Sequence, residues 1–261
     1  MQEPTRSTAL KKALRRRSAH LAVAFGPAAA RTRHRTTRPG ESGSRLVQAP
    51  VFILSVAQAD ATLLGSLLNR HSRIHVPASQ HLDVLEVRPK REYADDVMGA
   101  LGLDRTELQH LLWDRMLHHQ LELSGKDLVV DQTVTNTLAW PNIATAWPSA
   151  RFVLLLRNPG YVVESALRQT MNRRENVIQE VLAYATGIEA ARATANALTI
   201  RYEDLVAEPD KATRRICDFL GVAWQPDMLD HGQVGHGPVP RNAVLPPQLQ
   251  DIAGLWGYLS A

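Results

Sequence analysis

The stretch Arg157-Asn-Pro-Gly-Tyr-Val-Val-Glu-Ser165 follows directly on the apolar run Phe152-Val-Leu-Leu-Leu156. The apolar run is typical of a buried strand, and the residues after it predict a loop and then a helix that carries Ser165 near its start. An arginine at a strand end and a hydroxyl at a helix start can bind one phosphate from two sides. The stretch therefore predicts a phosphate-binding unit of strand, loop and helix.

Other short apolar runs predict three further strands: Val51-Phe-Ile-Leu-Ser-Val56, Leu128-Val-Val-Asp131 and Leu198-Thr-Ile-Arg201. Helical segments separate the four strands, which favours parallel pairing and an α/β fold with a doubly wound parallel sheet. Ligands of such sheets bind at the carboxyl ends of the strands. We therefore expect residues 57–61, 132–136 and 157–165 to line one cleft.

Local signals mark the ends of several helices. Asp104 is a good N-cap with Glu107 three residues on, and Gly125 ends the helix that it starts. Pro209 stands at the start of another helix, which Gly221 closes after Leu220. Further helices are predicted over residues 62–70, 135–147, 175–196 and 247–256.

The basic charge of the chain is concentrated in its first residues. Residues 1–50 hold eleven Lys and Arg against two acids, although the net charge of the whole chain is only +4. We assign residues 1–48 to a basic, disordered leader and residues 49–261 to one α/β domain. Three interpretations of the leader stay open: a solvated tail, a contact with an acidic partner such as nucleic acid or a lipid surface, and an export signal built on Arg15-Arg-Arg17 and the short apolar run after it.

Cysteine content and hydropathy say less about function. Cys217 is the only cysteine, so the chain cannot form an internal disulfide, and its place in an amphipathic run predicts a buried helix residue. A thiol of this kind suits a reducing cytoplasm, which is the location we expect. The sequence holds no run of eighteen apolar residues that would predict a membrane-spanning helix.

The 157–165 stretch resembles the 3'-phosphate-binding signature of sulfotransferases, enzymes that use 3'-phosphoadenosine 5'-phosphosulfate (PAPS). The run Arg201-Tyr-Glu-Asp-Leu-Val-Ala-Glu-Pro209 resembles another stretch of the family, and the likeness to its bacterial members extends over residues 51–256. It implies a P-loop-NTPase-like topology and PAPS-dependent sulfuryl transfer to a hydroxyl or amine of a small molecule or carbohydrate. It further implies that Arg157 and Ser165 bind the 3'-phosphate, that Arg168 adds a cation and that Tyr202 contacts the adenine.

The loop after the first strand departs from the family pattern. Relatives have a Pro-Arg-Ser-Gly-Thr-Thr type loop that binds the 5'-phosphosulfate, whereas this chain has Ala57-Gln-Ala-Asp-Ala-Thr62. Thr62 is retained, Gln58 lacks the cation, and Asp60 replaces a glycine. A carboxylate about 4 Å from a phosphate charge costs on the order of 4 kcal/mol at an effective dielectric constant of about 20. The loop therefore argues against ordinary binding of PAPS.

Two further positions depart from the family pattern. The family's glutamate base falls at Ser79, which cannot act as a base unaided, and His81 lies two residues on as a substitute. The family's lysine after the second strand is replaced by Gln132. Two alternatives to ordinary catalysis follow: an impaired pseudo-sulfotransferase that serves as a nucleotide-binding or scaffold protein, and transfer from a donor of different charge.

Other site types find little support. The histidines at positions 71, 75, 81, 118 and 119 match no compact metal motif, so no metal is expected. The sequence holds neither a Gly-x-x-x-x-Gly-Lys-Ser/Thr motif nor a Gly-x-Ser-x-Gly motif, which argues against a nucleotide triphosphatase and an esterase. Relatives have a longer basic loop that closes over the nucleotide. Here the loop is shorter, and Arg241 has two interpretations: an exposed, solvated arginine, which we favour, and a contact with a phosphate.

Overall fold

The computed structural model describes residues 45–78, 80–82, 85–88, 93–230 and 244–259. Ser79, Arg241 and nearly all of the predicted leader lie outside these residues. Within them, none of the helices is both long and apolar enough to cross a membrane. The same residues contain no group of three or more His, Cys, Asp or Glu side chains placed to bind a metal ion.

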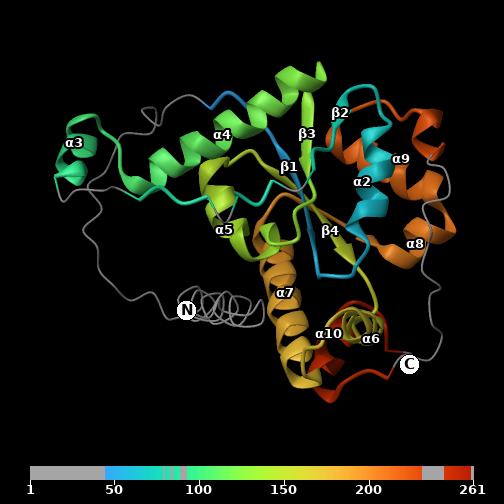
Figure 1. Cartoon of the computed structure of the whole chain (residues 1–261). Coiled ribbons are helices and arrows are strands. Elements are labelled where there is room, and N and C mark those ends of the chain that lie inside the picture. The colour runs from blue at the N-terminus through green and yellow to red at the C-terminus, as the bar shows by residue number, and fades with distance from the viewer. Residues whose placement is uncertain (1–44, 79, 83–84, 89–92, 231–243, 260–261) are drawn as a thin grey trace, which may run out of the picture. The chain divides into compact units, whose positions relative to one another are not determined.

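A five-stranded parallel sheet forms the centre of the described chain (Figure 1). Its order is β2 (Ile74–His75), β3 (Leu128–Asp131), β1 (Val51–Ser55), β4 (Arg151–Leu156) and β5 (Ala197–Arg201). The predicted α/β class and the parallel sheet are confirmed, and the four predicted strands are β1, β3, β4 and β5. β2 was not predicted from the sequence, because two residues are too few to show a strand pattern.

Helices cover both faces of the sheet, and for this reason the central strands β1 and β4 consist mainly of apolar residues. Phe52 and Leu54 of β1 point into one core, and Val51 and Ile53 point into the other. The first core lies under α4 (Arg105–Ser124), α5 (Asn136–Ala146), α6 (Pro159–Gln169), α7 (Arg174–Thr194) and α10 (Gln250–Leu255). The second lies under α2 (Ala61–Asn69), α8 (Tyr202–Ala207) and α9 (Pro209–Leu220), on the other side of the sheet in Figure 1. The remaining short helices are α3 (Ala94–Ala100) and the 3₁₀ turns η2 (Pro226–Leu229) and η3 (Pro247–Leu249).

The predicted helix ends agree with the structure. The Asp104 carboxylate accepts a hydrogen bond of 2.7 Å from the backbone N–H of Glu107 at the start of α4. Gly125 and Gly221 follow α4 and α9 with φ of 66° and 70°, a left-handed conformation that glycine adopts without steric cost. The predicted helix over residues 247–256 begins instead as the 3₁₀ turn η3 and continues as α10.

The chain immediately before β1 packs on the α4 side of the domain. Arg45 makes a bidentate ion pair with Glu107 at 2.8 Å and donates to the carbonyl of Ala146. The backbone N–H groups of Leu46 and Val47 donate to the buried Asp114 carboxylate. These bonds fix the position at which the chain enters the central strand.

The strand order brings the predicted cleft segments together. β1 lies between β3 and β4, so the residues that follow these three parallel strands leave the sheet at one edge. These residues are 57–61, 132–136 and 157–165. This edge is where the candidate site is built.

Candidate active site

The loop after β1 is a tight turn into α2. Gln58 and Asp60 have φ of 66° and 54°, and the N–H of Ala59 donates to the carbonyl of Val56 at 3.1 Å. Left-handed backbone is uncommon for residues other than glycine, although aspartate tolerates it better than most. Asp60 is the N-cap residue of α2, yet its side chain makes no capping hydrogen bond. The carboxylate is therefore directed elsewhere.

Arg157 lies at the carboxyl end of β4 and is almost fully buried, with 2 % of its surface exposed. Its guanidinium carbon lies 4.1 Å from the ring centroid of Tyr161 and 4.0 Å from that of Tyr202. A cation over an aromatic ring is attracted by the negative face of the ring, and desolvation strengthens this attraction. The two tyrosines thus hold the guanidinium of Arg157, which is predicted to bind a phosphate, in place.

The partner of Arg157 is the loop after β1. Its Nη1 donates to Asp60 Oδ2 at 2.5 Å and to the backbone carbonyl of Gln58 at 2.7 Å. Its Nη2 is buried and has no hydrogen-bond partner among the described residues. The sequence predicted that Asp60 would face a phosphate of the donor. In the structure the charge of Asp60 is instead paired with Arg157, the arginine predicted to bind the 3'-phosphate.

Tyr202 begins α8 and is completely buried. Burial raises the pKa of its hydroxyl to about 12; the Arg157 charge lowers this pKa and the Asp60 charge raises it. The Asp60 carboxylate thus lies close to the Tyr202 hydroxyl as well as to Arg157. Tyr202 therefore belongs to the Arg157 cluster.

The first turn of α6 is well defined. The side chain of Asn158 accepts hydrogen bonds from the N–H groups of Gly160 and Tyr161, and Pro159 stands in the first turn. Ser165 lies one turn beyond Tyr161 on the same face of the helix and is half-buried. Arg168 follows near the end of α6, where it is exposed.

Ser165 and Arg157 are not bonded to each other. The Ser165 hydroxyl makes no hydrogen bond within the described residues, while Arg157 is bonded to the loop. The two residues predicted to bind phosphate thus lie at the end of the predicted strand and on the predicted helix. Of the two, only the side chain of Arg157 has a hydrogen-bond partner among the described residues.

The end of β3 holds a buried polar cluster that the sequence analysis did not single out. Asp131 is 1 % exposed, and its Oδ1 accepts hydrogen bonds from the N–H and the hydroxyl of Thr133 at 2.8 and 2.6 Å. The Thr133 hydroxyl in turn accepts from the N–H of Gln80 at 2.9 Å. Burial raises the pKa of Asp131, and the hydrogen bonds and the nearby His81 lower it to a smaller extent. An acidic residue at the end of a buried strand was the signal that could have revealed this cluster.

His81 lies next to this cluster. It has a φ of 50° and an exposed side chain, and its backbone N–H is 3.5 Å from the Thr133 hydroxyl. The predicted substitute base is therefore placed at the edge of the sheet where β3 ends. Ser79, the other predicted position, lies outside the described residues.

The side chain of Gln132 lies against α2. A Cβ at Gly65 would lie 1.9 Å from Gln132 Oε1, so α2 needs a glycine for the side chain to lie against it. The Oε1 atom is buried and has no partner among the described residues. Thr62, also on α2, is exposed in the first turn, where its hydroxyl is accessible.

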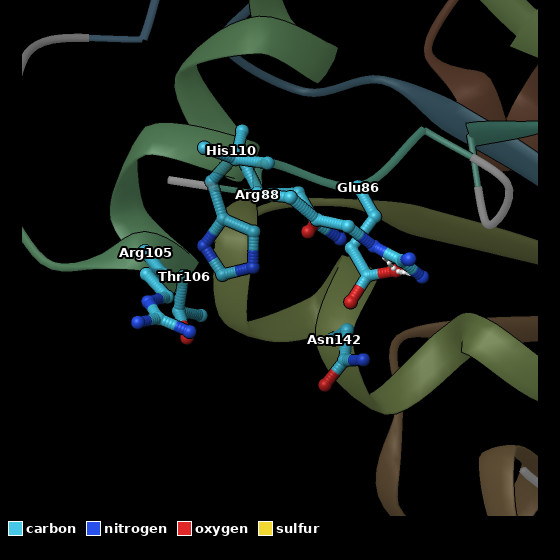
Figure 2. Close-up of a pocket in the computed structure, with 8 residues that line it drawn as sticks. Glu86, Arg88, Arg105, Thr106, His110 and Asn142 are labelled. Atoms are coloured by element: carbon cyan, nitrogen blue, oxygen red, sulfur yellow. Dashed lines mark hydrogen bonds and ion pairs between the residues drawn. The ribbon is translucent and has the colours of Figure 1, made fainter. Parts of the chain in front are cut away.

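A cavity of about 570 Å³ lies apart from the Arg157 cluster, between α4, α5 and the segment 86–88. Figure 2 shows side chains from all three elements around it. Both of its arginines are paired, Arg88 with Glu86 at 2.5 Å and Arg105 with Asp95 at 2.9 Å. Burial lowers the pKa of His110, and the nearby Arg45 lowers it further. The lining residues are Glu86, Val87, Arg88, Arg105, Thr106, Gln109, His110 and Asn142.

Comparison with known proteins agrees with this fold. A sequence model of the sulfotransferase family matches residues 50–226, more than half of the chain. The sulfotransferase domain from the curacin biosynthetic pathway superposes with a TM-score of 0.63 at 22 % identity, over 83 % of this chain and 99 % of that one. The sulfotransferase domain of the Synechococcus PCC 7002 olefin synthase gives 0.62 at 20 % identity, over 82 % and 97 %.

A curated protein shows a similar level of likeness. Nodulation protein NoeE of Sinorhizobium fredii (strain NBRC 101917 / NGR234) is 23 % identical in an alignment 207 residues long, which covers 65 % of this chain and 49 % of NoeE. The chain thus spans about half the length of this relative.

Proposed function

The chain belongs to the sulfotransferase family, and we propose that it transfers a sulfuryl group from PAPS to a hydroxyl or amine of a small molecule or carbohydrate. The observation that carries the proposal is the buried Arg157 at the carboxyl end of β4, beside the first turn of α6, with a buried Nη2 that finds no partner among the residues that the structure describes. A buried guanidinium with a free donor suits an anionic ligand, since Arg binds phosphate through two parallel N–H groups.

The residues around the edge of the sheet fit the two ends of such a donor unequally. At the 3'-phosphate end, Arg157 and Ser165 would bind the phosphate, Arg168 would add a cation, and Tyr202 would contact the adenosine. At the 5' end, the first N–H groups of α2, which the Asp60 side chain does not cap, and the Thr62 hydroxyl would bind the phosphosulfate. Gln58 contributes a neutral amide here, so this end offers little positive charge to balance the negative charge of the phosphosulfate.

Transfer also requires removal of a proton from the acceptor. PAPS supplies the sulfuryl group: its bond to the 5'-phosphate breaks, a bond to the acceptor oxygen or nitrogen forms, and 3'-phosphoadenosine 5'-phosphate (PAP) leaves. We assign the proton to a ring nitrogen of the exposed His81, which Thr133 and Asp131 hold at the end of β3. Gln132 carries no charge and is turned onto α2, so it would give little stabilisation.

The cavity beside α4 is our candidate for the acceptor site. The segment 86–88 that lines it begins five residues after His81, and Thr106, Gln109 and Asn142 offer neutral hydrogen-bonding groups. Such a lining suits an acceptor with several hydroxyl or amine groups. The cytoplasm, with its reducing conditions, remains the location that we propose, and an acidic partner for the leader remains a prediction.

A second candidate function is an impaired relative that binds a nucleotide or serves as a scaffold. Three observations favour it: Asp60 pairs with Arg157, Gln58 leaves the loop without a cation, and the neutral Gln132 lies against α2. Losing one preorganised charge donor typically slows an enzyme by about 10²–10³. On this alternative the nucleotide binds, but transfer is very slow or absent.

Titration of PAP into the protein by calorimetry tests the nucleotide site, with Arg157→Ala as the control. Micromolar binding that the variant loses would support the site, and an assay of sulfuryl transfer to a panel of hydroxyl and amine acceptors would then separate the two candidate functions. Absence of binding by the wild type and by a variant with Asp60 neutralised, at millimolar PAP, would refute a role for PAPS.

A further inference from the structure

The anion that faces Arg157 in this structure comes from the protein itself. Asp60 and the Gln58 carbonyl both bond to Nη1, although Asp60 and Arg157 are 97 residues apart in the sequence. We propose that Asp60 acts as a latch: its carboxylate occupies Arg157 in the free protein and has to leave before the 3'-phosphate of a nucleotide can bind. The proposal rests on the function proposed above, and it makes Asp60 the residue that sets the affinity of this site for 3'-phosphorylated nucleotides.

The two partners of the ion pair differ in their freedom to move. Arg157 is 2 % exposed and lies between two tyrosine rings, so it cannot turn to water. The Asp60 side chain is 42 % exposed, so its carboxylate can move into solvent and be hydrated there. A buried charge needs a partner, and Arg157 can therefore exchange one anion for another more readily than it can lose its anion. Exchange of Asp60 for a phosphate is the route that the burial of the pair leaves open.

A phosphate also satisfies more of the guanidinium than Asp60 does. Asp60 and Gln58 use only Nη1, and Nη2 remains buried without a partner among the described residues. A phosphate has enough oxygens to accept from both Nη atoms at once. The incoming ligand therefore gains a hydrogen bond that the latch does not make.

The loop geometry weakens the latch further. Asp60 holds its carboxylate on Arg157 from a left-handed backbone, with φ of 54° and ψ of 42°. This conformation is less favourable for aspartate than for glycine, although aspartate tolerates it better than most residues with a Cβ. Movement of the loop to free Arg157 would relieve part of this strain, so the closed and the open arrangements are closer in free energy than the short ion pair alone implies.

The latch predicts an effect on one phosphate only. Neutralising Asp60 should tighten binding of PAP, which carries the 3'-phosphate, and leave adenosine 5'-phosphate (AMP) nearly unchanged. Simple repulsion between Asp60 and the 5'-phosphate would instead tighten both ligands alike. The two ligands thus separate an occupied arginine from a general electrostatic effect.

The experiment is calorimetric titration of PAP and AMP into the wild type, Asp60→Asn and Asp60→Gly. Asp60→Asn keeps the side-chain size, while Asp60→Gly also removes the backbone strain and serves if the first variant folds poorly. Asp96→Asn, an exposed residue of α3, is the control for the change in net charge. A latch that is closed in about nine molecules of ten weakens binding roughly tenfold, so we expect both Asp60 variants to bind PAP roughly tenfold tighter or more. AMP binding and the Asp96 variant should not change.

Each of the other outcomes decides a different question. Equal PAP affinity in the wild type and both Asp60 variants would overturn the latch and leave the proposed function standing. Equal tightening of PAP and AMP would overturn it in favour of general repulsion. If none of the proteins binds PAP, the next measurement is titration with inorganic phosphate. Tighter phosphate binding by Asp60→Asn than by the wild type would support the latch and refute the proposed function. Equal phosphate binding by the two proteins would refute both.

Discussion

Thr137 offers a direct test of how the central strand is held at the candidate site. Its hydroxyl accepts a hydrogen bond of 2.9 Å from the N–H of Ser55 and donates one of 2.8 Å to the carbonyl of the same residue. The pairing of β1 with β3 runs only as far as Phe52 and Asp131, while β4 continues alongside Ser55. Thr137, from the first turn of α5, thus takes the place of a strand partner on the β3 side.

Replacement of Thr137 by Val removes the hydroxyl and keeps the shape. Thr137 is completely buried, so water does not replace the hydroxyl, and both backbone groups of Ser55 lose their partner. A buried group without a partner costs about 1–3 kcal/mol, and the added methyl recovers a part of that by apolar burial, so we expect a loss of about 2–4 kcal/mol in the free energy of unfolding. Because Ser55 leads directly into the loop with Asp60, this variant should also hold that loop less firmly.

Thr137→Ser is the matched control, because it keeps the hydroxyl and deletes one buried methyl, at a cost of about 1 kcal/mol. Urea unfolding followed by tryptophan fluorescence measures both variants, since the chain has five tryptophans. A Val variant that is no less stable than the Ser variant would show that the two hydrogen bonds do not hold the end of β1, and would refute this reasoning.

Three further predictions follow from the burial and packing of single residues. Gly187→Ala should destabilise the protein by about 1–3 kcal/mol in urea unfolding, because its Cβ would lie 2.6 Å from the Thr137 carbonyl, whereas Gly99→Ala, with nothing within 4 Å, should be neutral or stabilising. Burial raises the pKa of Asp131 in the folded state. The contribution of Asp131 to stability is therefore full below pH 3.8, the ordinary pKa, and is lost as the pH rises through the raised pKa. The stability of Asp131→Asn relative to the wild type should therefore increase between pH 4 and pH 8. A difference in free energy of unfolding between the two proteins that stays constant across that range would contradict this prediction. Burial raises the pKa of Cys217 to about 11, so a colorimetric thiol reagent at pH 8 should react with the chain only after unfolding, and rapid labelling of the folded protein would contradict its burial.

The regular parts of the fold were predictable because their signals are local. Residues 51–54 and 152–156 are continuous apolar runs, because both faces of their sheet are covered. Asp104 and Gly125 mark the ends of α4 through contacts that span only a few residues. The edge of the sheet that carries the site follows from the parallel order alone. β2 was not predictable, because its two residues pair with β3 only through the tertiary fold.

Side-chain partners at the site were less predictable, since they depend on backbone angles that residue types do not determine. Gln132 has the length to reach the cleft, yet it lies against α2, because Gly65 leaves room there. The role of Thr133 in positioning residues 80 and 81 depends on a contact across more than fifty residues. The assignments of His81 and Ser165 stay predictions that only binding and activity measurements can test.

The effect expected of Asp60 on ligand binding differs between the sequence and the structure, because the structure identifies its partner. From the sequence, a carboxylate in a phosphate loop argues for repulsion of the ligand, an effect that acts on any nearby anion. In the structure the carboxylate neutralises Arg157, so the cost to a ligand is the breaking of one defined ion pair, and this cost falls on the group that needs Arg157. If Asp60 only repelled anions, the loop would have lost its ability to bind a phosphate together with its cation. Because Asp60 instead occupies Arg157, the anion-binding arginine is still present and becomes available when Asp60 leaves. The distinction matters for engineering: neutralising Asp60 alone should strengthen binding of the 3'-phosphate, and faster transfer should further require a cation at Gln58 or Gln132.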